Sequence, residues 1–172
     1  MLSAEFNKPF YDRPTLTVAR DLLGKQLVFQ KEDSWESLLI NEVEAYDGPQ
    51  DKACHAHCGR TKRSEVMFGP AGYWYVYLCY GVHWLANIVV GPEDYPAAVL
   101  IRGAGQFDGP GKLTKAIGMT GDANRKKADS ASGFFVTDGI KVSKSKIKKT
   151  PRIGIDYAGP VWAKKPYRFV LQ

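Results

Sequence analysis

The segment Tyr73–Val90 constrains the fold more than any other part of this chain, because it carries the strongest β signal. Its first twelve residues, YWYVYLCYGVHW, contain six tyrosines and tryptophans, whereas aromatic residues make up only 12% of the chain. Aromatic and β-branched residues favour strands. Tyr80-Gly81 resembles the tip of a hairpin between two such strands, although tyrosine fits a tight type I′ turn poorly. The sequence therefore predicts a protruding β-hairpin with Tyr80 at its tip.

The pairing within this hairpin depends on the length of its turn. If Tyr80 and Gly81 alone form the turn, Cys79 pairs with Val82, and Tyr77 and Asn87 lie on opposite faces. A bulge or a longer turn would bring Tyr77 and Asn87 to the same face. In either case Tyr75 and Tyr77 share a face, which in a basic protein suits the stacking of bases.

The other elements follow from hydrophobic periodicity and from glycine or proline boundaries. Strands and a few helices occur without regular βαβ alternation, which predicts an α+β fold with a mainly antiparallel sheet and surrounding helices. The 172 residues suit one compact domain, residues 1–172. Helices are expected at Thr15–Leu23 and Gly111–Ile117, a helix or loop at Asn124–Asp129, and strands at Lys25–Gln30, Leu38–Tyr46, Ala98–Arg102, Phe134–Val136, Ile153–Tyr157 and Arg168–Leu171.

The charge balance suggests an anionic partner. The formal net charge is +6 and the sequence pI is about 9.2, which is compatible with binding to nucleic acid. Five lysines lie between Lys141 and Lys149. This segment is interpreted either as a solvated loop or as a non-specific contact to DNA phosphates.

Composition also bears on the compartment. No apolar run reaches the roughly 18 residues of a membrane span, and the first fourteen residues contain no apolar core of a secretion signal. The three cysteines are an odd, low number, which argues for a reducing compartment and against a disulfide framework. An intracellular protein without membrane contact is expected.

Two familiar site types fit the sequence poorly. The segment Cys54–Cys58, with Cys79 and His83, resembles a zinc ligand set, but the expected hairpin geometry separates Cys79 from His83. A triphosphate-binding loop needs a glycine five residues before Gly111, where Gln106 stands, and a hydroxyl residue directly after Lys112, where Leu113 stands. Neither a zinc site nor a nucleotide-triphosphate site is therefore expected.

Glu44 and Arg102 are the residues most suited to chemistry. Glu44 ends the run Glu42-Val43-Glu44 near the close of a predicted strand. An ionised carboxylate can deprotonate a water molecule and stabilise an adjacent oxocarbenium-like centre. Arg102 could hold that water or the carboxylate, although each residue could instead form a surface salt bridge.

Five blocks of sequence, spread from about Asp21 to Phe169, occur in one order, which is more specific than any single motif. They are Glu44-Ala45-Tyr46-x-Gly48-Pro49-x-Asp51-x-Ala53-x-His55; Gly59-Arg60-Thr61-x-Arg63 with Met67-Phe68; Tyr75-Val76-Tyr77-x-x-Tyr80-Gly81 with Asn87; Leu100-Ile101-Arg102 with Gly109-Pro110-Gly111-Lys112-Leu113; and Arg152-Ile153-Gly154 with Trp162-Ala163-x-Lys165-Pro166-x-Arg168-Phe169. Together these blocks resemble the methylpurine (alkyladenine, or 3-methyladenine) DNA glycosylase family.

The resemblance implies a monofunctional, monomeric enzyme of base-excision repair that needs no metal or cofactor. Such an enzyme flips an alkylated or deaminated purine (3-methyladenine, 7-methylguanine or hypoxanthine) out of double-stranded DNA. It then hydrolyses the N-glycosidic bond and leaves an abasic site, without a lysine Schiff base. The alternatives are a non-catalytic nucleic-acid-binding module that uses the same aromatic and basic residues, and a metal-dependent nuclease.

The resemblance also assigns the catalytic residues. Glu44 would activate the water, and Arg102 would help to hold that water. A backbone carbonyl near Ile153 would provide a third contact to the water.

The base-binding residues are assigned in the same way. Tyr46 and His55 would stack on one face of the flipped base, and Tyr77 on the other. Asn87 would screen against the 2-amino group of normal guanine. Tyr80 would fill the gap that the flipped base leaves in the duplex.

Overall fold

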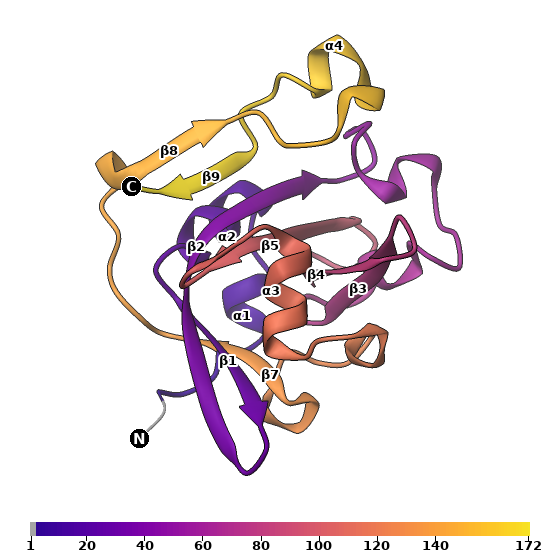
Figure 1. Cartoon of the computed structure of the whole chain (residues 1–172). Helices are drawn as coiled ribbons and strands as arrows, with labels where there is room; N and C mark the ends of the chain where they lie inside the picture. The colour runs from indigo at the N-terminus through magenta and orange to yellow at the C-terminus, as the bar shows by residue number, and fades with distance from the viewer. Residues whose placement is uncertain (1–2) are drawn as a thin grey trace.

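The computed structural model describes residues 3–172, and its centre is an antiparallel sheet with helices packed on it (Figure 1). The strands run in the order β3-β4-β5-β2-β1-β7, while β6 pairs with β5, and β9 pairs with both β2 and β8. Their bounds are β1 Gln26–Lys31, β2 Ser34–Asp47, β3 Trp74–Cys79, β4 His83–Val89, β5 Ala97–Ala104, β6 Phe107–Asp108, β7 Phe134–Thr137, β8 Ile147–Thr150 and β9 Arg168–Leu171.

Two longer helices cover this sheet. Helix α2 (Thr15–Leu22) buries its apolar stripe against β2 and β5, and α3 (Pro110–Ile117) packs on β4 and β5. Proline at the start of α3 and left-handed Gly118 just after it are typical helix boundaries. Two short helices, α1 (Lys8–Tyr11) and α4 (Gly159–Trp162), complete the set of α-helices in residues 3–172. The predicted mixed α+β fold, with its mainly antiparallel sheet, is confirmed.

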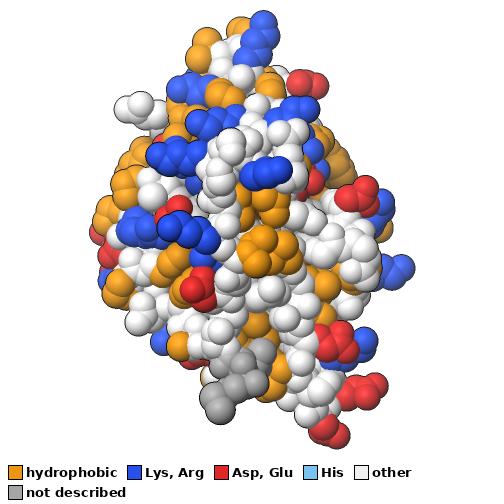
Figure 2. Space-filling model, turned by 90° about the vertical axis from the view of Figure 1, so that its left-hand side faces the viewer, with side chains coloured by type: hydrophobic (Ala, Val, Ile, Leu, Met, Phe, Trp, Pro, Cys, Tyr) orange, Lys and Arg blue, Asp and Glu red, His pale blue; other side chains and the backbone are white. Residues whose placement is uncertain are grey.

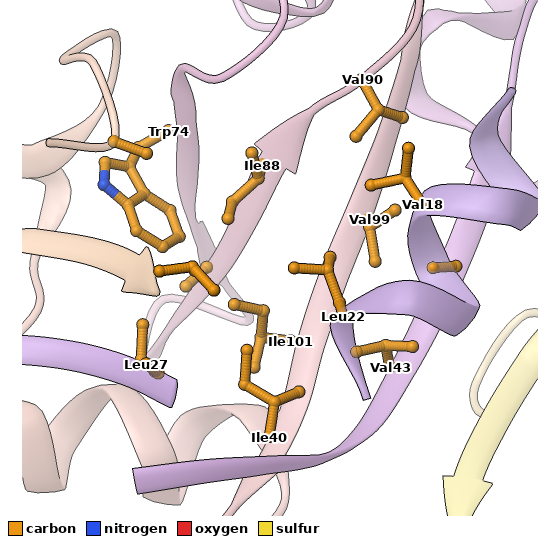
Figure 3. Packing of buried hydrophobic residues seen from close by; sticks show 14 of the residues in the cluster. Val18, Leu22, Leu27, Ile40, Val43, Trp74, Ile88, Val90, Val99 and Ile101 are labelled. Carbon is orange, nitrogen blue, oxygen red and sulfur yellow. The ribbon is translucent and has the colours of Figure 1, made fainter. Parts of the chain in front are cut away.

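The largest buried cluster lies against one face of the sheet, and both α2 and α3 contribute side chains to it (Figure 3). Val18 and Leu22 of α2 belong to the same buried cluster as Val43 of β2 and Val99 of β5. Side chains alternate along a strand, so Val43 points into the core and the neighbouring Glu44 points to the opposite face. Glu44 is nevertheless fully buried, which means that other segments cover that face as well.

The turn of the β3–β4 hairpin is one residue longer than the simplest prediction. Cys79 pairs with His83, and Tyr80, Gly81 and Val82 lie between them. Tyr80 and Gly81 both have positive φ (52° and 68°), as a type I′ turn requires, and Val82 adds the extra residue. The predicted pairing of Cys79 with Val82 is therefore wrong.

The longer turn changes which residues share a face. Tyr75 is now the direct partner of Asn87, so Tyr75, Tyr77 and Asn87 lie on one face of the hairpin. Cys79 and His83 also lie opposite each other, contrary to the geometry expected from the sequence. Even so, residues 3–172 contain no group of three or more His, Cys, Asp or Glu placed to hold a metal ion.

Two other local predictions need correction. The predicted strand Ile153–Tyr157 is absent: the chain turns at Gly154, where φ is 74°, and continues into the 3₁₀ helix Asp156–Ala158. The last three residues of the segment Lys141–Lys149 are not a loop but part of the edge strand β8, which pairs with β9. The lysines provide no apolar pattern that would predict a strand, so β8 can be recognised only from its pairing with β9.

Strand β8 lies at the upper left of Figure 1, and Figure 2 views the molecule from that side. On this face, lysine and arginine side chains surround exposed hydrophobic ones (Figure 2).

The helices within the described part of the chain all fall short of the length and apolarity that a bilayer crossing needs.

Candidate active site

Two adjoining cavities lie between the β3–β4 hairpin and the segments that cover the outer face of β2. The smaller, of about 30 Å³, is lined by Tyr46, Ala53, His55, Met67, Tyr75, Tyr77, Asn87 and Tyr157. The larger is a groove of about 900 Å³, whose lining includes Glu44, Tyr46, His55, Tyr77, Tyr80, Arg102 and Ile153. All eight residues singled out from the sequence therefore line one or both cavities.

Glu44 is a buried carboxylate held by several donors. The Tyr46 hydroxyl donates to its Oε2 at 2.8 Å, and the Ile153 backbone amide donates to its Oε1 at 2.8 Å. The Nε of Arg102 lies 3.6 Å from the same Oε1. Burial raises the pKa of Glu44, whereas Arg102, the Ile153 amide and Tyr46 act in the opposite direction. The alternative of a surface salt bridge does not fit a side chain that is fully buried.

Ile153 contacts the site through its backbone amide. The sequence suggested a carbonyl in this region as a contact for the water, whereas the observed hydrogen bond runs from the Ile153 N–H to Glu44. The turn at Gly154 permits this approach, because an extended strand here would carry the chain past the carboxylate. This contact joins residues 109 positions apart.

An internal ion pair fixes the segment that carries Ile153. Arg152 donates to both carboxylate oxygens of Asp51, with Nη2 lying 2.8 Å from Oδ1, and both side chains are fully buried. Asp51 also accepts from the backbone N–H groups of Asp47 and Ala53, each at 3.0 Å. The pair thus clamps the loop after β2 to the chain just before Ile153. Sequence reasoning noted Asp51 and Arg152 only as positions of a motif.

Aromatic rings crowd the smaller cavity. The His55 and Tyr77 ring centroids are 4.6 Å apart with an interplanar angle of 72°. The His55 Nδ1 shares a hydrogen bond of 2.8 Å with the Tyr75 hydroxyl. Burial, assisted by the cation of Arg63, lowers the pKa of His55 to about 4, so the imidazole is neutral at pH 7.

The two rings contact each other directly and leave no slot between them. A base stacked between two rings needs contacts of about 3.5–4 Å on each side, or about 7–8 Å in all. The observed separation of 4.6 Å is smaller. A base can therefore enter between His55 and Tyr77 only if one ring moves.

Asn87 forms a fixed wall of the smaller cavity. Its side chain is buried, and its Nδ2 donates to the carbonyls of Tyr75 at 3.1 Å and Leu85 at 3.4 Å. These bonds hold the amide against the hairpin. Tyr157 also lines this cavity and donates to the Ala53 carbonyl at 3.0 Å. Sequence reasoning missed Tyr157, because it fell in the wrongly predicted strand.

Tyr80 stands at the tip of the hairpin with 90% of its surface exposed. It lines the larger groove together with the basic side chains of Lys52, Arg63 and Lys112. A tyrosine at positive φ is unusual, and no packing explains its ring. The combination of an exposed ring and nearby cations suits contact with a nucleic acid.

The sequence of this chain is similar to one protein family and to several known proteins. Residues 9–108 and 104–172 match the family described as "Methylpurine-DNA glycosylase (MPG)". A relative from Methanocella arvoryzae is 44% identical over 182 residues, covering 94% of this chain and 90% of the relative. One from Myxococcus xanthus is 45% identical (92% and 86% covered), and one from Legionella pneumophila is 41% identical (96% and 93% covered). All three are provisionally named 3-methyladenine DNA glycosylases.

Proposed function

Because this chain belongs to the methylpurine-DNA glycosylase family, a family of hydrolytic DNA glycosylases, we propose that it removes 3-methyladenine, 7-methylguanine and hypoxanthine from double-stranded DNA. The observation that carries the proposal is Glu44, a buried carboxylate that borders a groove continuous in its lining with an aromatic cavity. A passive DNA-binding surface has no use for such a group, because a carboxylate repels phosphates.

In the proposed reaction, Glu44 accepts a proton from a water molecule. The water oxygen forms a bond to C1′ of the flipped nucleotide, and the electron pair of the C1′–N9 bond passes to the departing base. Arg102 and a backbone carbonyl near Ile153 hold the water, while the Ile153 amide and the Tyr46 hydroxyl orient the carboxylate. The negative carboxylate also stabilises the positive charge that develops on the sugar.

The flipped base is proposed to stack between the rings of the smaller cavity. Tyr46 and His55 contact one face of the base, and Tyr77 contacts the other after the His55–Tyr77 contact opens. Asn87, held by its two hydrogen bonds, blocks the space that the 2-amino group of guanine would need. Neutral His55 adds no charge that would repel a cationic methylated purine.

The direct test is cleavage of a duplex that carries one hypoxanthine or one 7-methylguanine, in the presence of EDTA. We expect a strand break at the lesion only after alkali, because hydrolysis leaves an intact abasic strand. An undamaged duplex of the same sequence is the control. Tight binding to the duplexes without release of any base would instead indicate a non-catalytic binding module.

The rate of base release should depend on pH through Glu44. Only the ionised carboxylate accepts a proton, so the single-turnover rate should rise with pH. Since burial raises the pKa of Glu44, the midpoint should lie above the value of about 4.3 at which an exposed glutamate titrates. Tyr46→Phe removes one hydrogen bond to the ionised form and should move the midpoint further up. A rate that is constant across the acidic range would contradict this role.

Tyr80→Ala should weaken base flipping without weakening the fold. Flipping costs a few kcal/mol of unstacking and unpairing, and a ring inserted into the vacated space offsets part of that cost. The exposed Tyr80 contributes no packing, so the melting temperature should stay within about 2 °C, the change expected for a surface substitution.

Fluorescence of a reporter base at the lesion measures the flipping equilibrium of this variant. The loss should be larger for a base in a stable pair than for the same base opposite a mismatch. Val82→Ala, at the neighbouring exposed position of the turn, is the control and should leave flipping unchanged. If Tyr80→Ala and Val82→Ala had equal flipping constants, another residue would fill the space left by the flipped base.

A further inference from the structure

A second glutamate lies beside the candidate catalytic one. Glu42 precedes Glu44 by two positions on β2, so both side chains point to the same face. The Oε1 of Glu42 accepts a hydrogen bond from the Nε of Arg102 at 2.8 Å and another from the Nε of Arg168 at 2.6 Å. The two arginines come from β5 and β9, the neighbours of β2 on either side. Glu42 therefore links three strands at the level of Glu44.

Arg102 is held by Glu42 rather than by Glu44. Its single Nε–H is 2.8 Å from the Glu42 carboxylate, whereas the nearest oxygen of Glu44 lies 3.6 Å away. A guanidinium carries four more N–H donors on its two Nη atoms. Within residues 3–172 these donors have no protein hydrogen-bond partner, and the side chain lines the larger groove. The anchor thus leaves most of the donors of Arg102 available to a ligand.

The strand pairing is adapted to this arrangement. The β2–β5 register is regular at Val43 but shifts at Glu42, which pairs with Gly103, so that Arg102 has no direct partner on β2. A Cβ at Gly103 would lie only 2.6 Å from the side-chain oxygen of Asn41 and 3.3 Å from the Cβ of Glu42. Glycine at this position therefore permits the close approach that brings Glu42 to Arg102.

Arg168 completes the cluster from the opposite side. It is the direct partner of Glu44 in the β2–β9 ladder, and its guanidinium reaches diagonally to Glu42. Its Nη1 also donates to the Thr150 hydroxyl of β8 at 3.1 Å. The edge hairpin β8–β9, which carries the lysine-rich segment, is thereby tied to the site.

We propose that Glu42 and Arg168 are positioning residues: Glu42 holds Arg102 by its Nε and Arg168 holds Glu42, so that the remaining donors of Arg102 face the reacting water. The pair also prevents Arg102 from closing onto Glu44 in a full ion pair, which would make the carboxylate a weaker base. The inference rests on the proposed function, because it assigns Glu44 as the base.

The charges around Glu44 predict in which direction each substitution shifts the ionisation of Glu44. The groups that face Glu44 are Arg102 from β5, Arg168 from β9, Arg152 and the Ile153 amide from the covering segment, and Tyr46 and Glu42 from β2. Removing the charge of Glu42 frees Arg102 to approach Glu44 and favours its ionised form. Removing the charge of Arg168 leaves the negative charge of Glu42 paired with Arg102 alone. This disfavours the ionised form of Glu44.

The test is the pH dependence of single-turnover cleavage of a hypoxanthine duplex by Glu42→Gln and Arg168→Gln. Both variants should lose up to about 100-fold of the plateau rate, the effect of a misplacement near 1 Å, while the Kd for the duplex changes little. The acid limb of the pH–rate profile, where the rate rises with pH, should move to lower pH in Glu42→Gln and to higher pH in Arg168→Gln. Thr150→Val removes the other hydrogen bond of Arg168 without changing charge, and should leave the limb in place.

Folded variants that keep the wild-type plateau, or whose limbs move in the same direction, would overturn the proposal. If neither glutamine variant folds, Arg168→Lys decides, because it keeps the charge but loses the anchoring Nε. A reduced plateau with an unshifted limb supports the proposal, and a wild-type plateau overturns it. Glu44→Gln, measured alongside, separates the two levels: a wild-type rate there would overturn the proposed function itself.

Discussion

Glu44→Gln is expected to lower the single-turnover rate of base release by about 10²- to 10⁴-fold, the usual contribution of a general base. The glutamine side chain has nearly the same shape, so its oxygen can still accept from the Ile153 N–H while its NH₂ group donates to the Tyr46 hydroxyl oxygen. What it loses is the ability to accept a proton from water and to stabilise positive charge on the sugar.

Binding should survive this change, because removing a negative charge near DNA phosphates does not weaken association. The measurement is single-turnover cleavage with enzyme in excess, together with a titration of the lesion duplex. Glu36→Gln is a matched control on the same strand, since Glu36 is exposed and pairs with Lys31 at the far end of β2. A cleavage rate for Glu44→Gln equal to that of the control would show that another group activates the water.

Asp51→Ala is expected to lower the free energy of unfolding by about 3–5 kcal/mol, because it leaves a buried guanidinium without its counter-charge. Asp51 and Arg152 are both fully buried, and Asp51 also caps two backbone N–H groups of the loop after β2. The change should also release the segment that presents the Ile153 amide to Glu44, so activity should fall even where the protein is folded.

Urea denaturation measures the change in stability. The exposed pair Lys8–Glu93 provides the control, because Glu93→Ala should leave the denaturation midpoint nearly unchanged. The double variant Asp51→Ala/Arg152→Met removes both charges and should be less destabilised than Asp51→Ala alone. A single variant as stable as the control would mean that the ion pair does not clamp the site.

The elements that the sequence predicted correctly are those whose signal is local. Helices α2 and α3 have an apolar stripe with glycine or proline near their ends, and the aromatic β3–β4 segment alternates around a glycine turn. These patterns depend on neighbours within a few positions, so they can be recognised without knowledge of the fold. The order of the sequence blocks likewise identified the family, and with it the residues that the structure gathers around the two cavities.

Contacts between distant parts of the chain were decided only by the tertiary structure. One extra residue in the hairpin turn moved Asn87 to the face of Tyr77, and a register is a property of two strands rather than of one. The Ile153 amide meets Glu44 across 109 positions, and Arg152 meets Asp51 across 101. By itself the sequence determined the kind of fold and the set of reactive groups. Their burial and pairing required the sheet to bring remote segments together, because desolvation and charge pairing depend on distances in space.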